Sequence, residues 1–180
     1  MKNAAWNRIA RAAAVAALAL STVTGSAWAA PRAGEAVAAA RAESLDGKAF
    51  DTRSVKGQTV LVFYEDKDTA NQNAAFKNEL GRLRKATGFK PGVRVVAVAD
   101  VSSYDFWPAK GLVQDAIKKQ QKASGVTIFL DWSGKFGTAL KARKGVSNVV
   151  LIGPDGNVMV SHEGVVSADV ASRIKAAVSR

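Results

Sequence analysis

The acidic stretch Glu65-Asp66-Lys67-Asp68 is the densest group of side chains that could do chemistry. Carboxylate oxygens of this kind hold Ca²⁺ or Mg²⁺ in proteins, or would serve an enzyme of non-thiol type. The spacing does not match that of a calcium-binding loop, and Lys67 interrupts the acidic run. A solvated loop is the favoured interpretation, so we predict no catalytic residue, no metal site and no cofactor site here.

His162 is the only histidine, which excludes a metal site built on two histidines. Ser161, His162 and Asp169 have the residue types of a hydrolytic triad, but closeness in sequence does not bring three side chains together in space. A hydrogen-bonded surface histidine is the simpler interpretation.

The sequence contains no cysteine. Thiolate nucleophiles, disulfides and sulfur-bound metals are therefore excluded for the whole chain. About 150 residues remain once an N-terminal targeting segment is set aside, enough for one domain with a single core that is stable without disulfides.

The N-terminus has the three parts of a secretory signal. The first eleven residues are basic without an acidic residue, residues 12–20 are apolar, and Ala27-Trp28-Ala29 supplies a small-residue cleavage site. The apolar run reaches only about 14 Å as a helix, against roughly 30 Å of hydrocarbon. We predict a cleaved signal peptide over residues 1–29, no transmembrane span, and a periplasmic protein.

The chain is basic, with a net charge of +11, and stays basic without residues 1–29. Its clearest basic face is Lys118 to Lys122, close in sequence to the aromatic segment around Trp107. An exported protein meets little nucleic acid, so we expect no nucleic-acid partner. Anionic envelope lipid or polysaccharide fits this charge better, and a solvated helix face is the simplest interpretation.

Residues 30–42 are rich in alanine and predict a flexible lead-in, and the pattern becomes regular from Glu43. Asp46-Gly47 predicts a hairpin turn. Continuous apolar runs predict buried strands, and Pro154 to Asn157 predicts a closing hairpin. The expected strands are 59–64, 93–98, 126–130, 148–152 and 158–161.

Four helices are expected between and after these strands. Asp68 is a candidate N-cap for a helix that stops near Gly88, and Ser167 for the last helix. Residues 109–123 predict a basic amphipathic helix with Leu112 on its apolar side, and residues 136–142 a short helix. The order of elements indicates an α/β class with a central mixed sheet, helices on both faces and an N-terminal β-hairpin.

Two strings of this sequence resemble the redoxin branch of the thioredoxin-like superfamily. ESLDGKAFDTRSVKGQTVLVFYED is similar to its opening hairpin and first buried strand, and NVVLIGPDGNVMVSHEGVVS to its closing hairpin. The resemblance covers residues 43–180 and implies a thioredoxin-like domain over that range. GVTIFLDWSGKFGTAL adds a closer similarity to YtfJ-type periplasmic proteins.

The resemblance also implies where redox chemistry is missing. Redoxins carry C-x-x-C just after the first long strand, and the alignment places Asp68 and Asn71 in the two cysteine positions. Ser147 stands where the family has the cis-proline that faces those cysteines. These three are vestigial active-site positions, because a carboxylate and an amide do not exchange electrons.

The function expected from the sequence is a non-catalytic binding or accessory module of the periplasm, without dithiol oxidoreductase activity. The possible partner surface gathers Glu65, Asp66 and Trp107 with the loop at Ser147, and a periplasmic protein is the possible partner. Two alternatives stay open: a non-thiol enzyme that uses the acidic loop Glu65–Asp68, and binding of anionic envelope components by the basic face.

Overall fold

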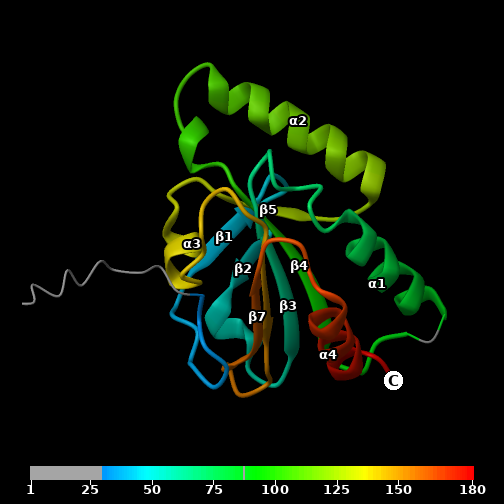
Figure 1. Ribbon diagram of the computed structural model, residues 1–180. Coiled ribbons are helices and arrows are strands. Elements are labelled where there is room, and N and C mark those ends of the chain that lie inside the picture. The colour runs from blue at the N-terminus through cyan, green and yellow to red at the C-terminus, as the bar shows by residue number, and fades with distance from the viewer. Residues whose placement is uncertain (1–29, 87) are drawn as a thin grey trace, which may run out of the picture.

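A seven-stranded mixed sheet forms the centre of the molecule, in the order β2-β1-β5-β4-β3-β6-β7 (Figure 1). The computed structural model describes residues 30–86 and 88–180, so the predicted signal peptide lies outside the described residues. β3 pairs with β4, and β4 with β5, in parallel, and the other pairs are antiparallel. The strands are β1 (Arg41–Ser44), β2 (Ala49–Asp51), β3 (Thr59–Glu65), β4 (Val93–Asp100), β5 (Ile128–Asp131), β6 (Asn148–Ile152) and β7 (Val158–Glu163).

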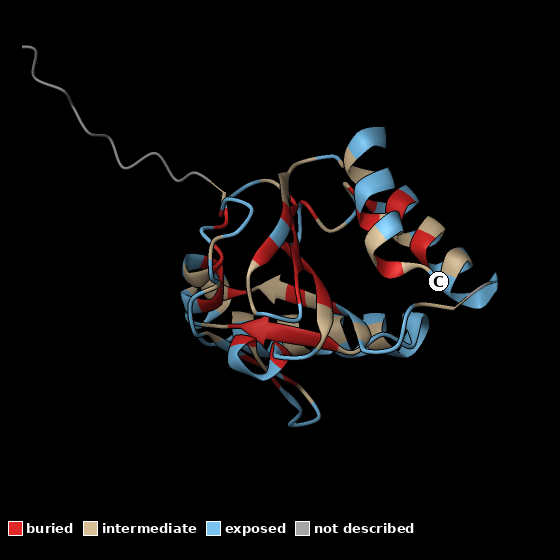
Figure 2. Cartoon of the chain, turned by 90° about the horizontal axis from the view of Figure 1, so that it is seen from below, coloured by how far each residue is buried: buried red, intermediate tan, exposed pale blue. Residues whose placement is uncertain are grey.

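Helices cover both faces of this sheet, as predicted. α1 and α4 pack on the face that carries Leu61 and Phe63, and α3 packs on the opposite face beside Tyr64. Figure 2 shows the buried residues concentrated in the sheet and on the helix sides turned towards it. The helices are α1 (Ala74–Ala86), α2 (Ala109–Ser124), α3 (Lys135–Ala139) and α4 (Ala168–Val178), with single 3₁₀ turns η1 (Thr52–Val55) and η2 (Ser102–Tyr104).

Local sequence signals fix several boundaries. Gly47 has φ of +78° in the turn between β1 and β2, a conformation that glycine adopts without a Cβ penalty. Asp155 accepts the Asn157 N–H in the β6–β7 hairpin, and the Ser167 hydroxyl accepts the Val170 N–H at the start of α4. The β1–β2 hairpin, the closing hairpin and the α4 cap are thereby confirmed.

Two surfaces differ from the sequence-based expectation. β4 is buried on one side only, since Val95 is 40% exposed. Leu112 of α2 is 70% exposed instead of packing inward, because only Val113 and Ile117 of that helix reach the cluster around Leu130.

The lead-in of residues 30–42 is joined to the sheet by its backbone. The Gly34 N–H donates to the Val158 carbonyl, and Ala36 forms a bridge with Asn157 beside β7. Residues 41 and 42 already belong to β1, and Ala42 is buried. The sequence predicts a flexible lead-in here, and the structure shows backbone pairing of residues 34 and 36 along the β7 edge. No helix in the described part of the chain is long and apolar enough to cross a membrane.

Candidate functional site

The segment after β3 is a hydrogen-bonded turn that precedes α1. The side-chain Oδ1 of Asp66 accepts from the Asp68 N–H at 3.0 Å, and from the N–H and hydroxyl of Thr69 at 2.8 Å each. α1 begins only at Ala74. The prediction that Asp68 caps this helix is wrong, because Asp66 closes a separate turn first.

Ser147 lies at the centre of a buried polar network. Its hydroxyl donates to Glu65 Oε1 at 2.7 Å and accepts from Asn73 Nδ2 at 2.9 Å. Its N–H donates to Gln72 Oε1 at 2.9 Å. The Ser147 loop thus meets the last two residues before α1, whereas Asp68 and Asn71 are exposed. The assignment of Asp68, Asn71 and Ser147 as vestigial redox positions stays a prediction.

The rest of this network satisfies its buried groups. Glu65, at 8% exposure, pairs with Lys77, whose Nζ lies 2.5 Å from Oε2 and also donates to the Ala70 carbonyl. Asn73 donates to the Gly164 carbonyl and accepts the Val166 N–H. Buried polar groups with complete partners rigidify a fold. Ser147 is fully buried and therefore positions loops and cannot reach a substrate.

A cavity of about 760 Å³ opens beside this network. It lies at the carboxyl ends of β3, β4 and β5, where α/β sheets place their ligands. Glu65 and Asp66 line it, together with α3 and the loop that leads to β6. The remaining lining residues are Tyr64, Asp100, Ser102, Ser133, Gly134, Gly137, Thr138, Ala142, Arg143, Lys144, Gly145, Val146 and Asn148.

Tyr64 and Asp100 form the floor of the cavity, and the carboxylate of Asp131 is bonded to Tyr64 outside the lining. Asp131 is 1% exposed, and its Oδ2 accepts from the Tyr64 hydroxyl at 3.1 Å and from the Gly137 N–H at 3.0 Å. Asp100 is its register partner on β4, and Asp100 Oδ1 accepts from the N–H and hydroxyl of Ser102. Burial first, and then these two carboxylates, raise the pKa of Tyr64 well above its usual range. Tyr64 is therefore a neutral hydrogen-bond donor.

Gly137 makes this arrangement sterically possible. A Cβ on Gly137 would stand 2.4 Å from the Tyr64 hydroxyl oxygen and 2.6 Å from the adjoining ring carbon. The Tyr64 ring is stacked on Phe136 with 6.2 Å between the ring centroids, and its hydroxyl is bonded to Asp131, so a Cβ would disturb both contacts. Only glycine admits the Tyr64 ring over the start of α3.

The lip of the cavity is basic. Arg143 reaches Glu163 at 3.4 Å, and Glu163 Oε1 is buried without a hydrogen-bond partner among the described residues. Lys144 forms no ion pair with a described side chain. The lining of the cavity therefore combines acidic residues, Glu65, Asp66 and Asp100, with the basic residues Arg143 and Lys144.

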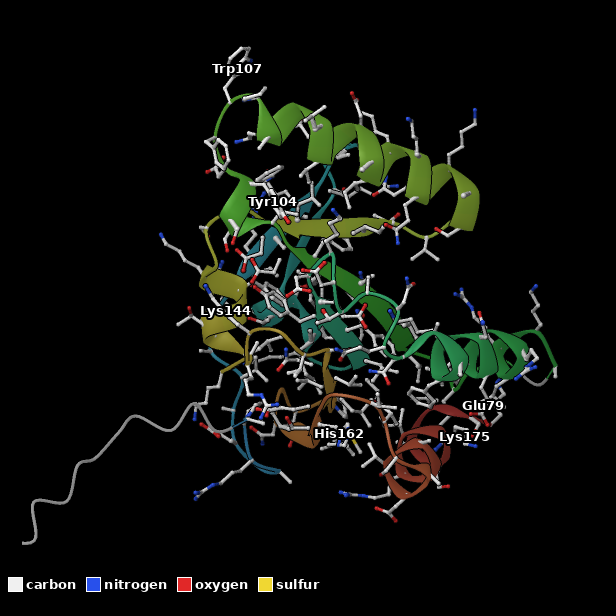
Figure 3. The ribbon with its side chains drawn as sticks, turned by 45° about the horizontal axis from the view of Figure 1, so that its top comes forward. Glu79, Tyr104, Trp107, Lys144, His162 and Lys175 are labelled. Carbon is white, nitrogen blue, oxygen red and sulfur yellow. The ribbon has the colours of Figure 1, made fainter. Side chains whose placement is uncertain are left out.

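The residues predicted as a partner surface are distributed over two places. Glu65 and Asp66 line the cavity, but Trp107 is 91% exposed and points away from it at the start of α2 (Figure 3). Lys144 is on the α3 side (Figure 3).

His162 contacts the Val165 carbonyl at 2.8 Å, which confirms a hydrogen-bonded surface histidine. Within residues 30–86 and 88–180, no three His, Asp or Glu side chains are arranged to hold a metal ion.

The sequence analysis did not predict three residues of this site: Tyr64, Asp100 and Asp131. Tyr64 ends the predicted strand 59–64, Asp131 follows the predicted strand 126–130, and Asp100 stands two residues after the predicted strand 93–98. A polar residue that ends a buried parallel strand is the signal that would have found the two aspartates.

Comparison with known proteins places the fold. A Chlorobium tepidum protein assigned as the thiol:disulfide interchange protein DsbE is similar with a TM-score of 0.61 and 20% identity, over 82% of this chain and 98% of that one. StoA from Bacillus subtilis is similar with a TM-score of 0.56 and 16% identity, over 77% and 97%. No protein-family model matches the sequence, and no curated protein matches it.

A third similar structure is the thioredoxin domain of a thiol-disulfide oxidoreductase from Bacteroides vulgatus. Its TM-score is 0.58 at 14% identity, over 81% of this chain and 96% of that one. Identities this low establish the fold alone. The chain has a thioredoxin-like α/β fold, and it has this fold without any cysteine.

Proposed function

We propose that this chain is an exported thioredoxin-fold protein that works in the periplasm as a non-redox binding or accessory module. The absence of cysteine supports the loss of thiol chemistry, and the basic, apolar and small-residue segments of the N-terminus support export. The similar structures named for thiol–disulfide exchange share the fold with a chain that lacks the reacting atoms. The resemblance of the quoted strings to the YtfJ-type periplasmic proteins supports the periplasmic part of the proposal.

The observation that carries this proposal is the cavity with its acidic floor. Neither Asp100 nor Asp131 forms an ion pair with a described side chain. Half-buried Asp100 accepts two hydrogen bonds from Ser102, and buried Asp131 accepts from Tyr64, Ser133 and Gly137, so donors satisfy both carboxylates without neutralising their charge. The negative charge of Asp100 in the cavity wall complements a lysine or arginine of a partner segment, which the cavity is large enough to admit.

The non-thiol enzyme has weaker support at this site. Glu65 is committed to Lys77 and Ser147, and Asp66 closes its own turn. The two carboxylates that chemistry would need are thus held by structural bonds. We therefore propose the acidic loop as part of the wall of a binding site.

Co-purification from envelope extract tests the proposal with a matched pair of variants. Asp100→Asn removes one negative charge from the cavity floor, and Asp115→Asn removes one from the exposed surface of α2. A stoichiometric partner should be retained by the parent chain and by Asp115→Asn, and lost at least tenfold with Asp100→Asn. Equal retention by both variants would refute the cavity as the site. Metal-dependent turnover that disappears in Asp66→Ala would favour the enzyme instead.

A further inference from the structure

Helix α2 and the turn before it form a surface that the rest of the molecule leaves uncovered. None of the sixteen residues of α2 is buried. Val113 and Ile117 pack inward, and Gln121 on the same side accepts the Ile128 N–H. Figure 1 shows this helix along one side of the molecule, outside the layer formed by α1 and α4.

Large apolar side chains gather at the N-terminal end of this surface. Phe106 is 60% exposed, Trp107 91% and Leu112 70%. Three such side chains within seven residues exceed the scattered exposure that soluble surfaces tolerate. Figure 3 shows Trp107 extended away from every other labelled side chain, in keeping with its 91% exposure.

Positive charge occupies the remainder of the same surface. Lys118, Lys119 and Lys122 are exposed, and the only acidic residue of the helix, Asp115, lies 3.7 Å from Lys118. Lys110 is engaged separately, with Asp105 and over the Trp132 ring. We name this α2 outer surface after its six exposed members: Phe106, Trp107, Leu112, Lys118, Lys119 and Lys122.

We propose that the α2 outer surface binds the headgroup region of an anionic phospholipid bilayer. Tryptophan is favoured at the boundary between headgroups and hydrocarbon, and tryptophan, phenylalanine and leucine form the apolar face of helices that lie there. Lysines beside such an apolar edge are typical of helices that lie on a membrane without crossing it. The chain stays basic without residues 1–29, and this charge complements an anionic surface.

The three lysines and the aromatic end contribute in different ways. Each lysine near an anionic surface strengthens binding about fivefold, and salt weakens this contribution because it screens charges beyond roughly 10 Å. The aromatic end adds a part that salt does not weaken, since it rests on removal of apolar surface from water. A bound chain would hold its cavity close to the membrane surface.

Sedimentation with vesicles tests this proposal with the full chain. Vesicles of 30 mol% phosphatidylglycerol in phosphatidylcholine should bind the protein at least tenfold more strongly than pure phosphatidylcholine. The triple variant Lys118→Glu, Lys119→Glu, Lys122→Glu should lose more than 100-fold of that binding. Every variant carries the same N-terminus, so any contribution of residues 1–29 cancels in the comparison.

A matched control separates this surface from net charge. Arg82, Arg84 and Lys85 are exposed on α1, and their reversal to glutamate changes the net charge of the chain equally. We expect less than a fivefold loss from the α1 reversal. Trp107→Ala should lose about tenfold at high and low salt, and the difference spectrum between parent and Trp107→Ala should show blue-shifted emission on binding.

Equal losses from the α1 and α2 reversals would overturn the proposal, as would an unshifted Trp107 emission with vesicles. Sedimentation velocity in the absence of lipid addresses other occupants of the surface. A concentration-dependent dimer abolished by Trp107→Ala would assign the surface to a second copy of the chain. Two results together would assign the α2 outer surface to a protein partner. Vesicles would fail to shift the Trp107 emission, and the purified partner would block vesicle binding.

Discussion

Ser147→Ala is the substitution whose cost the structure defines best. It removes the hydroxyl that donates to Glu65 Oε1 and accepts from Asn73 Nδ2. Asn73 Nδ2 keeps its bond to the Gly164 carbonyl, but Glu65 Oε1 loses the one hydrogen bond that the structure gives it. A buried charged acceptor left without its donor costs about 3 kcal/mol in free energy of unfolding.

Urea and thermal unfolding measure this loss directly. For a domain of this size, about 3 kcal/mol lowers Tm by roughly 6–12 °C. Ser172→Ala on the exposed side of α4 is the control, because its hydroxyl bonds only the Ala168 carbonyl, and it should change stability by less than about 0.5 kcal/mol. Asn73→Ala combined with Ser147→Ala should cost less than the sum of the two single changes. A Ser147→Ala protein as stable as Ser172→Ala would refute the reasoning that this network holds the loops together.

Four further predictions concern the cavity floor, the hairpin and the turn before α1. Gly137→Ala should lower the free energy of unfolding in urea by at least about 2 kcal/mol, because its Cβ meets the Tyr64 ring. The control Gly81→Ala in α1 meets open space and should stabilise by up to about 1 kcal/mol. A Gly137→Ala protein of unchanged stability would contradict the packing. The raised pKa of Tyr64 means that its contribution to stability is complete below about pH 10 and is lost as pH rises further, so Tyr64→Phe should flatten the decline of unfolding free energy between about pH 10 and 11.5. The Arg53 guanidinium lowers the pKa of Asp51 to about 2. The pair therefore stabilises the fold fully above about pH 4, and this stability is lost as pH falls through 2. In an NMR titration Arg53→Ala should return the Asp51 pKa towards 3.8, and an unchanged value would disprove the pairing. In Asp68→Cys/Asn71→Cys both thiols should titrate near about 8.5, because α1 begins only at Ala74, and a strongly lowered thiol pKa would show that the helix starts earlier.

Local signals explain why most of the fold was predictable. The residues from Val60 to Phe63 are all apolar because β3 is buried on both faces, and such a strand can be predicted without knowledge of its partners. The turn at Asp155 and the cap at Ser167 depend on side chains that bond two or three residues away. A few neighbouring residues of the sequence are enough to predict such features.

The candidate site depended on contacts between distant segments. Asn73 is buried because Ser147 and Gly164 reach it from 74 and 91 residues away. Asp100 and Asp131 become neighbours only through the parallel pairing of β4 with β5. The cap was misplaced because Asp68 is a residue type that caps helices, whereas Asp66 closes a separate turn there and α1 begins only at Ala74.

Photocrosslinking in living cells tests most directly that the cavity is a binding site. A photoreactive phenylalanine analogue at position 144 stands on the lip of the cavity, and the same group at position 85 stands on the exposed side of α1. The account predicts an adduct of defined mass from position 144, absent from position 85 and lost when Asp100→Asn is added. Intact-mass measurement detects protein and small-molecule adducts alike. No adduct at position 144, or the same adduct from both positions, would contradict the account.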